Sequence, residues 1–222
     1  DDDVWVVAIT GIADCFCSGV DLTPAGNAPD QGPMSKIQSQ IDDLNWVGQI
    51  PIAIRERCDK PVVAGLNGVA AGAGLALAMA CDIRIAAENA WLFPGYSRIG
   101  GSPDGGLSWT LPQAIGYEKA MRFLLENKRV DSDEALALGL IGEIVPDDQF
   151  QARFAEYCQS LTTISPIAAR LTKRVVREAT KIDIEAQVRY ELQTIGTAFA
   201  SKDGQESRRA FLERRQPEIK GR

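Results

Sequence analysis

Residues 61–86, PVVAGLNGVAAGAGLALAMACDIRIA, contain the elements from which an α/β fold is built. Pro61–Gly68 is largely apolar and β-branched at its start, which is typical of a strand buried on both faces. The glycine pair at 72–74 opens an apolar helical segment that runs to Ala80, and Asp82–Ala86 alternates as a second strand does. Strand, helix and strand in this order predict a crossover unit of a mainly parallel sheet.

The same pattern extends in both directions from this stretch. VWVVAIT, residues 4–10, predicts another strand buried on both faces, and residues 34–58 have a helical pattern. After about residue 147 the strand patterns stop. Three amphipathic helices are expected over 147–161, 165–180 and 182–201, each opened by an Asp or Ser that can cap it.

One segment differs in composition. Thr23–Ser35, TPAGNAPDQGPMS, is rich in Pro, Gly, Asn and Asp and is expected to be a long loop. A loop of this length is either a tolerated surface insertion or a lid over a binding site, and the sequence does not choose.

Composition narrows the possible chemistry. The 222 residues are 45% hydrophobic with a net charge of −6, so we expect a packed core and no nucleic-acid partner, which would need a basic face. No apolar run approaches the ~20 residues of a membrane span. The absence of histidine excludes Ser-His and Cys-His nucleophile pairs, and no metal site is expected. We interpret the five cysteines, an odd number, as reduced thiols of a cytoplasmic protein.

Three interpretations fit the glycines at 72–74. The start of a helix presents free N–H groups and the positive end of the helix dipole. A phosphate could bind there, although neither glycine-rich phosphate motif is present. Alternatively, the amides could stabilise an oxygen that becomes negative during a reaction, as in an oxyanion hole, or the small residues could simply allow close packing of helix and strand.

A second turn favours the oxyanion hole. CFCSGVDL, residues 15–22, also follows a strand and also places a glycine in a tight turn before a polar loop. Two such turns can each offer one N–H group to the same oxygen.

The chain resembles the crotonase superfamily over almost its whole length. VVAITGIADCFCSGVDL (6–22) is similar to that family's strand and its F-C-A-G-x-D-L motif, and residues 60–116 resemble its central block. SDEALALGLIGEIVPDDQ (132–149) and AFLERRQPEIKGR (210–222) are similar to its later landmarks. The resemblance implies an α/β fold: a crotonase-like ββα-repeat core with parallel sheets over residues 1–146, then an α-helical C-terminal tail over 147–222 that serves trimerisation.

The resemblance also implies a substrate class. Members bind an acyl-CoA thioester, so coenzyme A is part of the substrate and no covalently bound cofactor is expected. By motif position, the thioester oxygen would accept hydrogen bonds from the backbone N–H groups of Val20 and Ala73. Stabilising the enolate there makes the neighbouring carbon acidic enough for a carboxylate to deprotonate.

The acid and base groups differ among members and decide the reaction. Hydratases carry two glutamates, which by alignment of the motifs fall at Ala76 and Ser97. Neither position holds a carboxylate here. Adding water to a double bond needs one group to activate the water and one to deliver a proton, so an ordinary hydratase is not favoured.

A different carboxylate, Asp104 in SPDGG, comes just before a helical segment. On its own this position is typical of a helix N-cap. PDGG also resembles the segment in which double-bond-shifting members carry their single acidic base. We therefore expect Asp104 to be the acid/base of an enoyl-CoA isomerase, and it could serve as the cap as well.

Other activities stay open. A hydrolase or carbon–carbon lyase could use an aromatic pocket flanked by Trp91, Phe93, Tyr96 and Trp109, unless these side chains are ordinary core, and Tyr96 could donate a proton. Dehalogenases of the family use a carboxylate nucleophile and a histidine, which is missing here, and we expect them to be less similar to this chain. A CoA-binding scaffold without catalysis is the alternative outside enzymes.

The resemblance implies contacts with coenzyme A as well. Near the tail, Phe211 would stack on the adenine and Arg214 would pair with the 3′-phosphate, although Arg214 could equally be a solvated charge. We expect a homotrimer or hexamer. In the family an early strand and a helix with further CoA contacts precede residue 4, and we expect this chain to lack them. The other substrate contacts expected from the motifs are Ser18, Asp21, Leu22, Gly72, Gly74 and Ser97.

Overall fold

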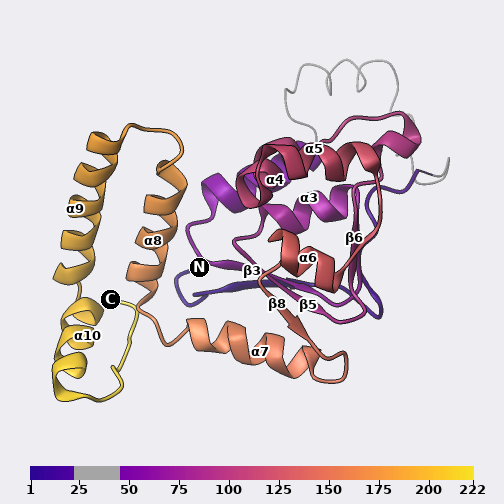
Figure 1. Cartoon of the computed structure of the whole chain (residues 1–222). Helices are drawn as coiled ribbons and strands as arrows, with labels where there is room; N and C mark the ends of the chain where they lie inside the picture. The colour runs from indigo at the N-terminus through magenta and orange to yellow at the C-terminus, as the bar shows by residue number, and fades with distance from the viewer. Residues whose placement is uncertain (23–45) are drawn as a thin grey trace, which may run out of the picture.

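A computed structural model describes residues 1–22 and 46–222. The expected loop at Thr23–Ser35 and the first part of the helical pattern at 34–58 lie outside the described residues. Figure 1 shows a core of strands with helices above and below it, and three tail helices beside it.

The described strands form two four-stranded sheets. The first has the order β1-β3-β5-β8 and is parallel throughout; the second has the order β2-β4-β6-β7, in which only β6 and β7 are antiparallel. Consecutive strands such as β3 and β4 therefore enter different sheets before the chain turns into α3, which confirms the expected ββα repeat. The strands are β1 (Val7–Thr10), β2 (Cys15–Cys17), β3 (Val62–Leu66), β4 (Val69–Ala71), β5 (Ile83–Ala87), β6 (Trp91–Phe93), β7 (Val130–Asp131) and β8 (Glu143–Val145).

Helices cover both sides of the first sheet (Figure 1). Helix α3 is the most deeply placed, because seven of its eight residues are buried and it is apolar on every side. On the other side, α7 packs Phe150 and Phe154 against Val63 and Ile85. The helices are α2 (Trp46–Pro51), α3 (Ala73–Ala80), α4 (Leu107–Ile115), α5 (Tyr117–Glu126), α6 (Ser132–Leu138), α7 (Phe150–Leu161), α8 (Pro166–Glu178), α9 (Ile184–Ala200) and α10 (Lys202–Glu213), with a π-helix η1 (Ile52–Arg57) and a 3₁₀ helix η2 (Tyr96–Ile99).

Strand predictions are confirmed at the centre and wrong at the edge. All five residues of β3 are buried, as expected. Strand β1 was expected to be buried on both faces, but it alternates between half-buried and exposed residues. It is one of the two edge strands of its sheet: Val7 and Ile9 pack on the core, whereas Ala8 and Thr10 face outward.

The tail is helical from α7 onward, and β8 is the last strand in the described chain. Ser165 and Asp183 cap α8 and α9, as predicted. Their side chains accept hydrogen bonds from the backbone N–H groups of Ala168 and Ala186. The predicted Asp cap of α7 is wrong. Gln149 occupies that position, and its side chain makes no capping bond.

Candidate active site

The first half of the site is the start of α3. Gly72 precedes the helix with φ 53° and ψ −121°, a conformation that residues with a Cβ rarely adopt. Its N–H donates to the carbonyl of Phe93 at 3.1 Å, and its carbonyl accepts from Ala76 at 3.0 Å. Ala73 is therefore the first helical residue, where an N–H group has no acceptor within the helix.

The turn after β2 lies directly against this helix start. A Cβ on Gly19, which has φ 98°, would lie 3.4 Å from the Ala73 nitrogen and 2.9 Å from the Ala71 carbonyl oxygen. Val20 follows immediately, so the two turns that carry the predicted oxyanion-hole amides are adjacent in space.

The glycines at 72 and 74 serve different needs. A Cβ on Gly74 would lie only 2.0 Å from the carbonyl oxygen of Cys17, so this glycine allows close packing of helix and strand. A Cβ on Gly72 would meet nothing closer than 4.0 Å, so its requirement is the positive φ. Close packing and helix-start geometry, alternatives in the sequence, are therefore both present.

The candidate carboxylate lies in the turn before α4. Tyr96 donates its hydroxyl to Asp104 Oδ1 at 2.9 Å, and the Asp104 backbone carbonyl accepts from Leu107 at 3.0 Å. Gly106 occupies the N-cap position of α4 and no side chain caps it. The expectation that Asp104 caps this helix is therefore wrong, because its carboxylate is turned toward Tyr96 instead.

Gly105 ties this turn to α3. Its φ is 57°, and a Cβ there would lie 2.9 Å from Ala76 Cβ and 3.2 Å from Val47 Cγ1. Ala73 and Ala76 are three residues apart and so share one face of α3. The Asp104 turn therefore packs against the first turn of α3, the helix that begins at Ala73.

The surroundings of Tyr96 keep its hydroxyl protonated. It is only 8% exposed, and burial, with the hydrogen bond to the Asp104 carboxylate as the next cause, raises the pKa of its hydroxyl. The phenol is therefore neutral at physiological pH and available as a donor. Ser97, which was predicted as a substrate contact, is exposed on η2, and its neighbour Tyr96 is the residue that reaches Asp104.

The remaining predicted residues are not gathered at one point. Ser18, Asp21 and Leu22 are exposed in or just after the turn that follows β2. Phe211, 82% exposed, and Arg214, at the C-terminal end of α10, lie on the tail, away from α3 and α4 in Figure 1. Within one chain these two residues are therefore not brought to Ala73.

The aromatic residues also separate. Trp91 and Phe93 are half-buried, with the guanidinium groups of Arg129 and Arg98 over their rings at 4.4 and 5.8 Å from the centroids. Trp109 lines a cleft on the tail side of α4. Of the four, only Tyr96 contacts Asp104. Among the described residues no cluster of His, Cys, Asp or Glu could hold a metal ion, and no helix is long and apolar enough to cross a membrane.

Comparisons with known proteins find the family that the sequence motifs resemble. A family described as enoyl-CoA hydratase/isomerase matches residues 1–222. The chain is similar to 1,2-epoxyphenylacetyl-CoA isomerase of Escherichia coli, with 31% identity over all of this chain and 83% of the relative. It is also similar to a solved enoyl-CoA hydratase from Polaromonas sp. JS666, with a TM-score of 0.87 and 29% identity over 99% of this chain and 84% of the other.

A dehalogenase is as similar as these. 4-Chlorobenzoyl coenzyme A dehalogenase-1 of Arthrobacter sp. is 30% identical over 88% of this chain and 69% of the relative. The expectation that dehalogenases would be less similar is therefore wrong. Relatives named for three different reactions share this fold, so the choice among reactions depends on the residues of the site.

Proposed function

Because the chain belongs to the enoyl-CoA hydratase/isomerase family, we propose that it shifts the double bond of an enoyl-CoA, with Asp104 as the single acid and base. The backbone N–H groups of Val20 and Ala73 would stabilise the thioester enolate. An acyl-CoA substrate is consistent with the family, whereas the isomerisation and the residue roles are our proposal.

The observation that carries the proposal is the Tyr96–Asp104 hydrogen bond at 2.9 Å. It occupies Oδ1 and orients the carboxyl group, which leaves Oδ2 to exchange a proton with the substrate. The contact of Gly105 with Ala76 supports the proposal, because it brings the carboxylate turn against the first turn of the helix that begins at Ala73. A proton shift next to a thioester requires a carboxylate near an oxyanion site.

The proposed reaction needs one proton and no other reactant. Asp104 Oδ2 removes a proton from C2 of a 3-enoyl-CoA, and the electron pair moves into the thioester. The thioester oxygen accepts hydrogen bonds from the two backbone N–H groups. The dienolate then takes the same proton back from Asp104 at C4. The double bond moves from C3–C4 to C2–C3, and the carboxylate is regenerated.

Hydration is less well supported. Ala76 is buried and has only a methyl group, and the donor beside Asp104 is the neutral phenol of Tyr96. That phenol already donates to Asp104, and its raised pKa makes it a poor acid, so the site offers one carboxylate where the addition of water needs both an activating base and a proton donor. Hydrolysis, carbon–carbon cleavage and binding without turnover remain the alternatives. The assay below separates isomerisation from all three.

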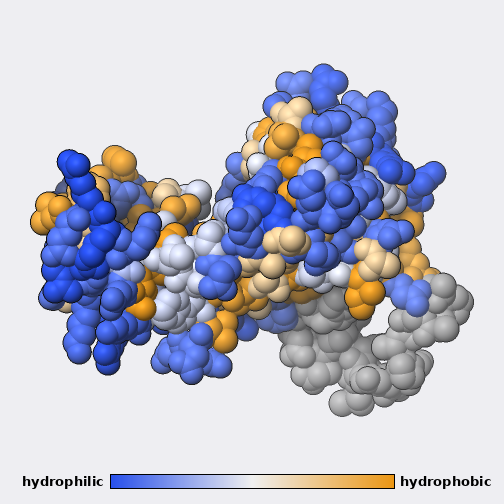
Figure 2. Space-filling model, turned by 90° about the horizontal axis from the view of Figure 1, so that it is seen from below, coloured by the Kyte–Doolittle hydropathy of each residue, from blue (hydrophilic) through white to orange (hydrophobic). Residues whose placement is uncertain are grey.

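We also propose that the tail acts between subunits of a homotrimer or hexamer. Large apolar side chains are exposed along the tail helices, and Figure 2 shows them among the polar side chains of the tail. Association would cover them and could bring Phe211 and Arg214 of one copy to the CoA of another. The large apolar side chains exposed on α9 are Ile184, Val188, Leu192, Ile195 and Phe199. Sedimentation velocity would report the assembly.

The test of the reaction follows the conversion of a 3-enoyl-CoA to the conjugated 2-enoyl-CoA by ultraviolet absorbance. Asp104→Asn keeps the size of the side chain but cannot accept the substrate proton, so kcat should fall by about 10²–10⁴-fold. Asp147→Asn, on the loop before α7, is the matched control and should retain parent activity. An Asp104→Asn enzyme with parent turnover would refute the proposal. A parent protein that binds the ester without converting it would favour the alternatives.

A further inference from the structure

The cleft that Trp109 lines is bounded by the tail helix α8 and the core. It encloses about 440 Å³, and none of its lining residues belongs to the candidate active site. A neighbouring hollow of about 370 Å³ shares Arg55, Trp109, Gln113 and Thr180 with it, so the two form one groove. Volumes of this size are ordinary for small-molecule sites. The apolar side chains of the larger part are Pro61, Ile83, Trp109, Leu161, Ile164 and Val176.

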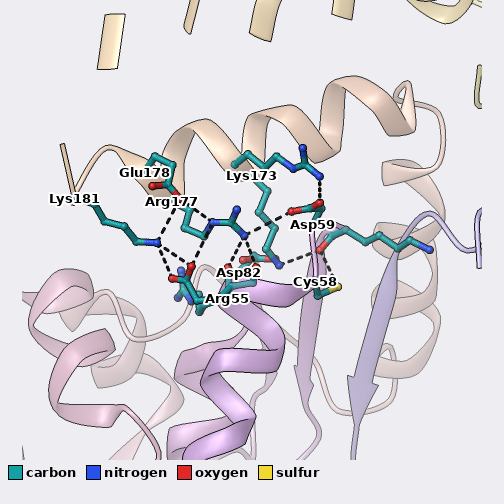
Figure 3. Close-up of polar contacts among 11 residues, drawn as sticks. Arg55, Cys58, Asp59, Asp82, Lys173, Arg177, Glu178 and Lys181 are labelled. Carbon is teal, nitrogen blue, oxygen red and sulfur yellow. Dashed lines mark hydrogen bonds and ion pairs between the residues drawn. The ribbon is translucent and has the colours of Figure 1, made fainter. Parts of the chain in front are cut away.

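Most charges at this groove are paired (Figure 3). Lys173 Nζ lies 2.6 Å from Asp82 Oδ2 and donates to the Lys60 carbonyl at 3.0 Å. Arg177 donates to the backbone carbonyls of Arg55 and Glu56 and makes an ion pair with Asp59. These groups therefore have their partners within the chain.

Arg55 is different. Its Nη2 donates to the carbonyls of Met79 and Cys81 at the end of α3, at 3.1 and 3.4 Å. Its Nε is buried with no hydrogen-bond partner, and no carboxylate of the described chain lies within ion-pair distance of the guanidinium. A buried donor without an acceptor is costly, so this group calls for an explanation.

The surroundings of Arg55 add to its positive charge. Arg84 also donates to the Cys81 carbonyl, at 2.8 Å, and burial followed by repulsion from Arg55 lowers the pKa of Arg84. Arg55 itself lies in the π-helix η1, a rare conformation that occurs often at functional sites. A guanidinium without a carboxylate partner among the described residues thus lines an apolar groove.

We propose that this groove binds a small amphipathic carboxylate, a molecule with one carboxylate on an apolar chain. The carboxylate pairs with the Arg55 guanidinium, which lines both parts of the groove, in a charge-assisted contact. The apolar chain lies against Trp109, Ile164 and Val176. The groove reaches Gly106 at the start of α4, but Asp104 lines neither part of it, and the proposal does not depend on the reaction proposed above.

Calorimetric titration of the full chain with octanoate tests this inference, with 1-octanol as the probe that lacks the charge. Octanoate should bind saturably and at least about tenfold more tightly than octanol. Arg55→Met should weaken octanoate binding about ten- to hundredfold, because a hydrogen bond to a charged group is lost. Arg122→Met removes the same charge from the exposed face of α5 and should change nothing.

A second variant guards against a folding defect, because Arg55 also holds the end of α3. Val176 is 66% exposed and lines the groove, so Val176→Trp fills it without touching Arg55 and should abolish binding. The inference is overturned if octanoate does not bind saturably, or if it binds equally well to Arg55→Met or Val176→Trp. Binding that disappears as the protein associates at higher concentration would assign the groove to a second copy and would also overturn it.

Discussion

The two ends of helix α3 are held in different ways. At its start, Gly72 and Gly74 let backbone approach backbone, and the groups within reach are uncharged N–H and carbonyl groups. At its end, the guanidinium groups of Arg55 and Arg84 bind the carbonyls of the last turn. Positive charge at a helix C-terminus compensates the helix dipole.

The difference fits the roles that we propose for the two ends. Under the proposed function, the start of α3 stabilises an oxyanion through backbone N–H groups, so bulky side chains and competing charges must be kept away from it. The other end is a point of attachment, where Asp82 follows the helix and pairs with Lys173 of α8 (Figure 3). We therefore expect steric changes to disturb the start of α3 most, and charge changes to disturb its end.

The largest effect is expected for Gly74→Ala. The new Cβ would lie 2.0 Å from the Cys17 carbonyl oxygen, which is backbone and cannot rotate away. The free energy of unfolding should fall by about 3 kcal/mol or more, as overpacking of a tight site does. Urea denaturation measures it. Gly72→Ala, which meets only strain at a positive φ, should cost about 1–2 kcal/mol and is the matched comparison.

Lys173→Met should have the next largest effect, now at the other end. It leaves Asp82 without its ion-pair partner, although Asp82 keeps the amide of Val62 and a fifth of its side-chain surface in solvent. We expect a loss of about 2 kcal/mol, below the about 3–5 kcal/mol of a fully buried pair. If this variant were more damaging than Gly74→Ala, the contrast between the two ends would be wrong.

Tyr96→Phe tests the start of α3, where we propose that catalysis takes place. It removes the donor to Asp104 Oδ1 and leaves the ring in place. Under the proposed function, kcat should fall about tenfold while KM changes little, since the hydrogen bond orients the carboxylate rather than the substrate. Tyr157→Phe on α7 is the control. Equal kcat in the Tyr96 variant and the parent would remove Tyr96 from the mechanism.

The smallest effect concerns pH. The hydrogen bond from Arg174 lowers the pKa of Asp59 below its ordinary 3.8. A group with a lowered folded-state pKa stabilises the fold above the unfolded pKa, and this contribution disappears as the pH falls through the folded value. Melting temperatures of the parent should therefore drop below about pH 4 more steeply than those of Asp59→Asn. Parallel curves would show that α8 does not depend on this pair.

From the sequence we could predict β3, the helix after the glycines, and the helices α7, α8 and α9, with the caps of α8 and α9 at Ser165 and Asp183. Asp104 as the candidate carboxylate came from the resemblance to the family. The predicted elements are local properties, because burial patterns, small residues and capping side chains lie within each segment. Periodicity and composition express them directly.

Only the tertiary structure decided which residue meets Asp104. Tyr96 and Ser97 are neighbours on one short 3₁₀ helix, and a one-residue difference selects the side chain that points inward. The structure also decided that β1 is an edge strand and that Arg55 reaches the end of α3 without finding a carboxylate. Each depends on contacts between segments far apart in the chain, which no local pattern encodes.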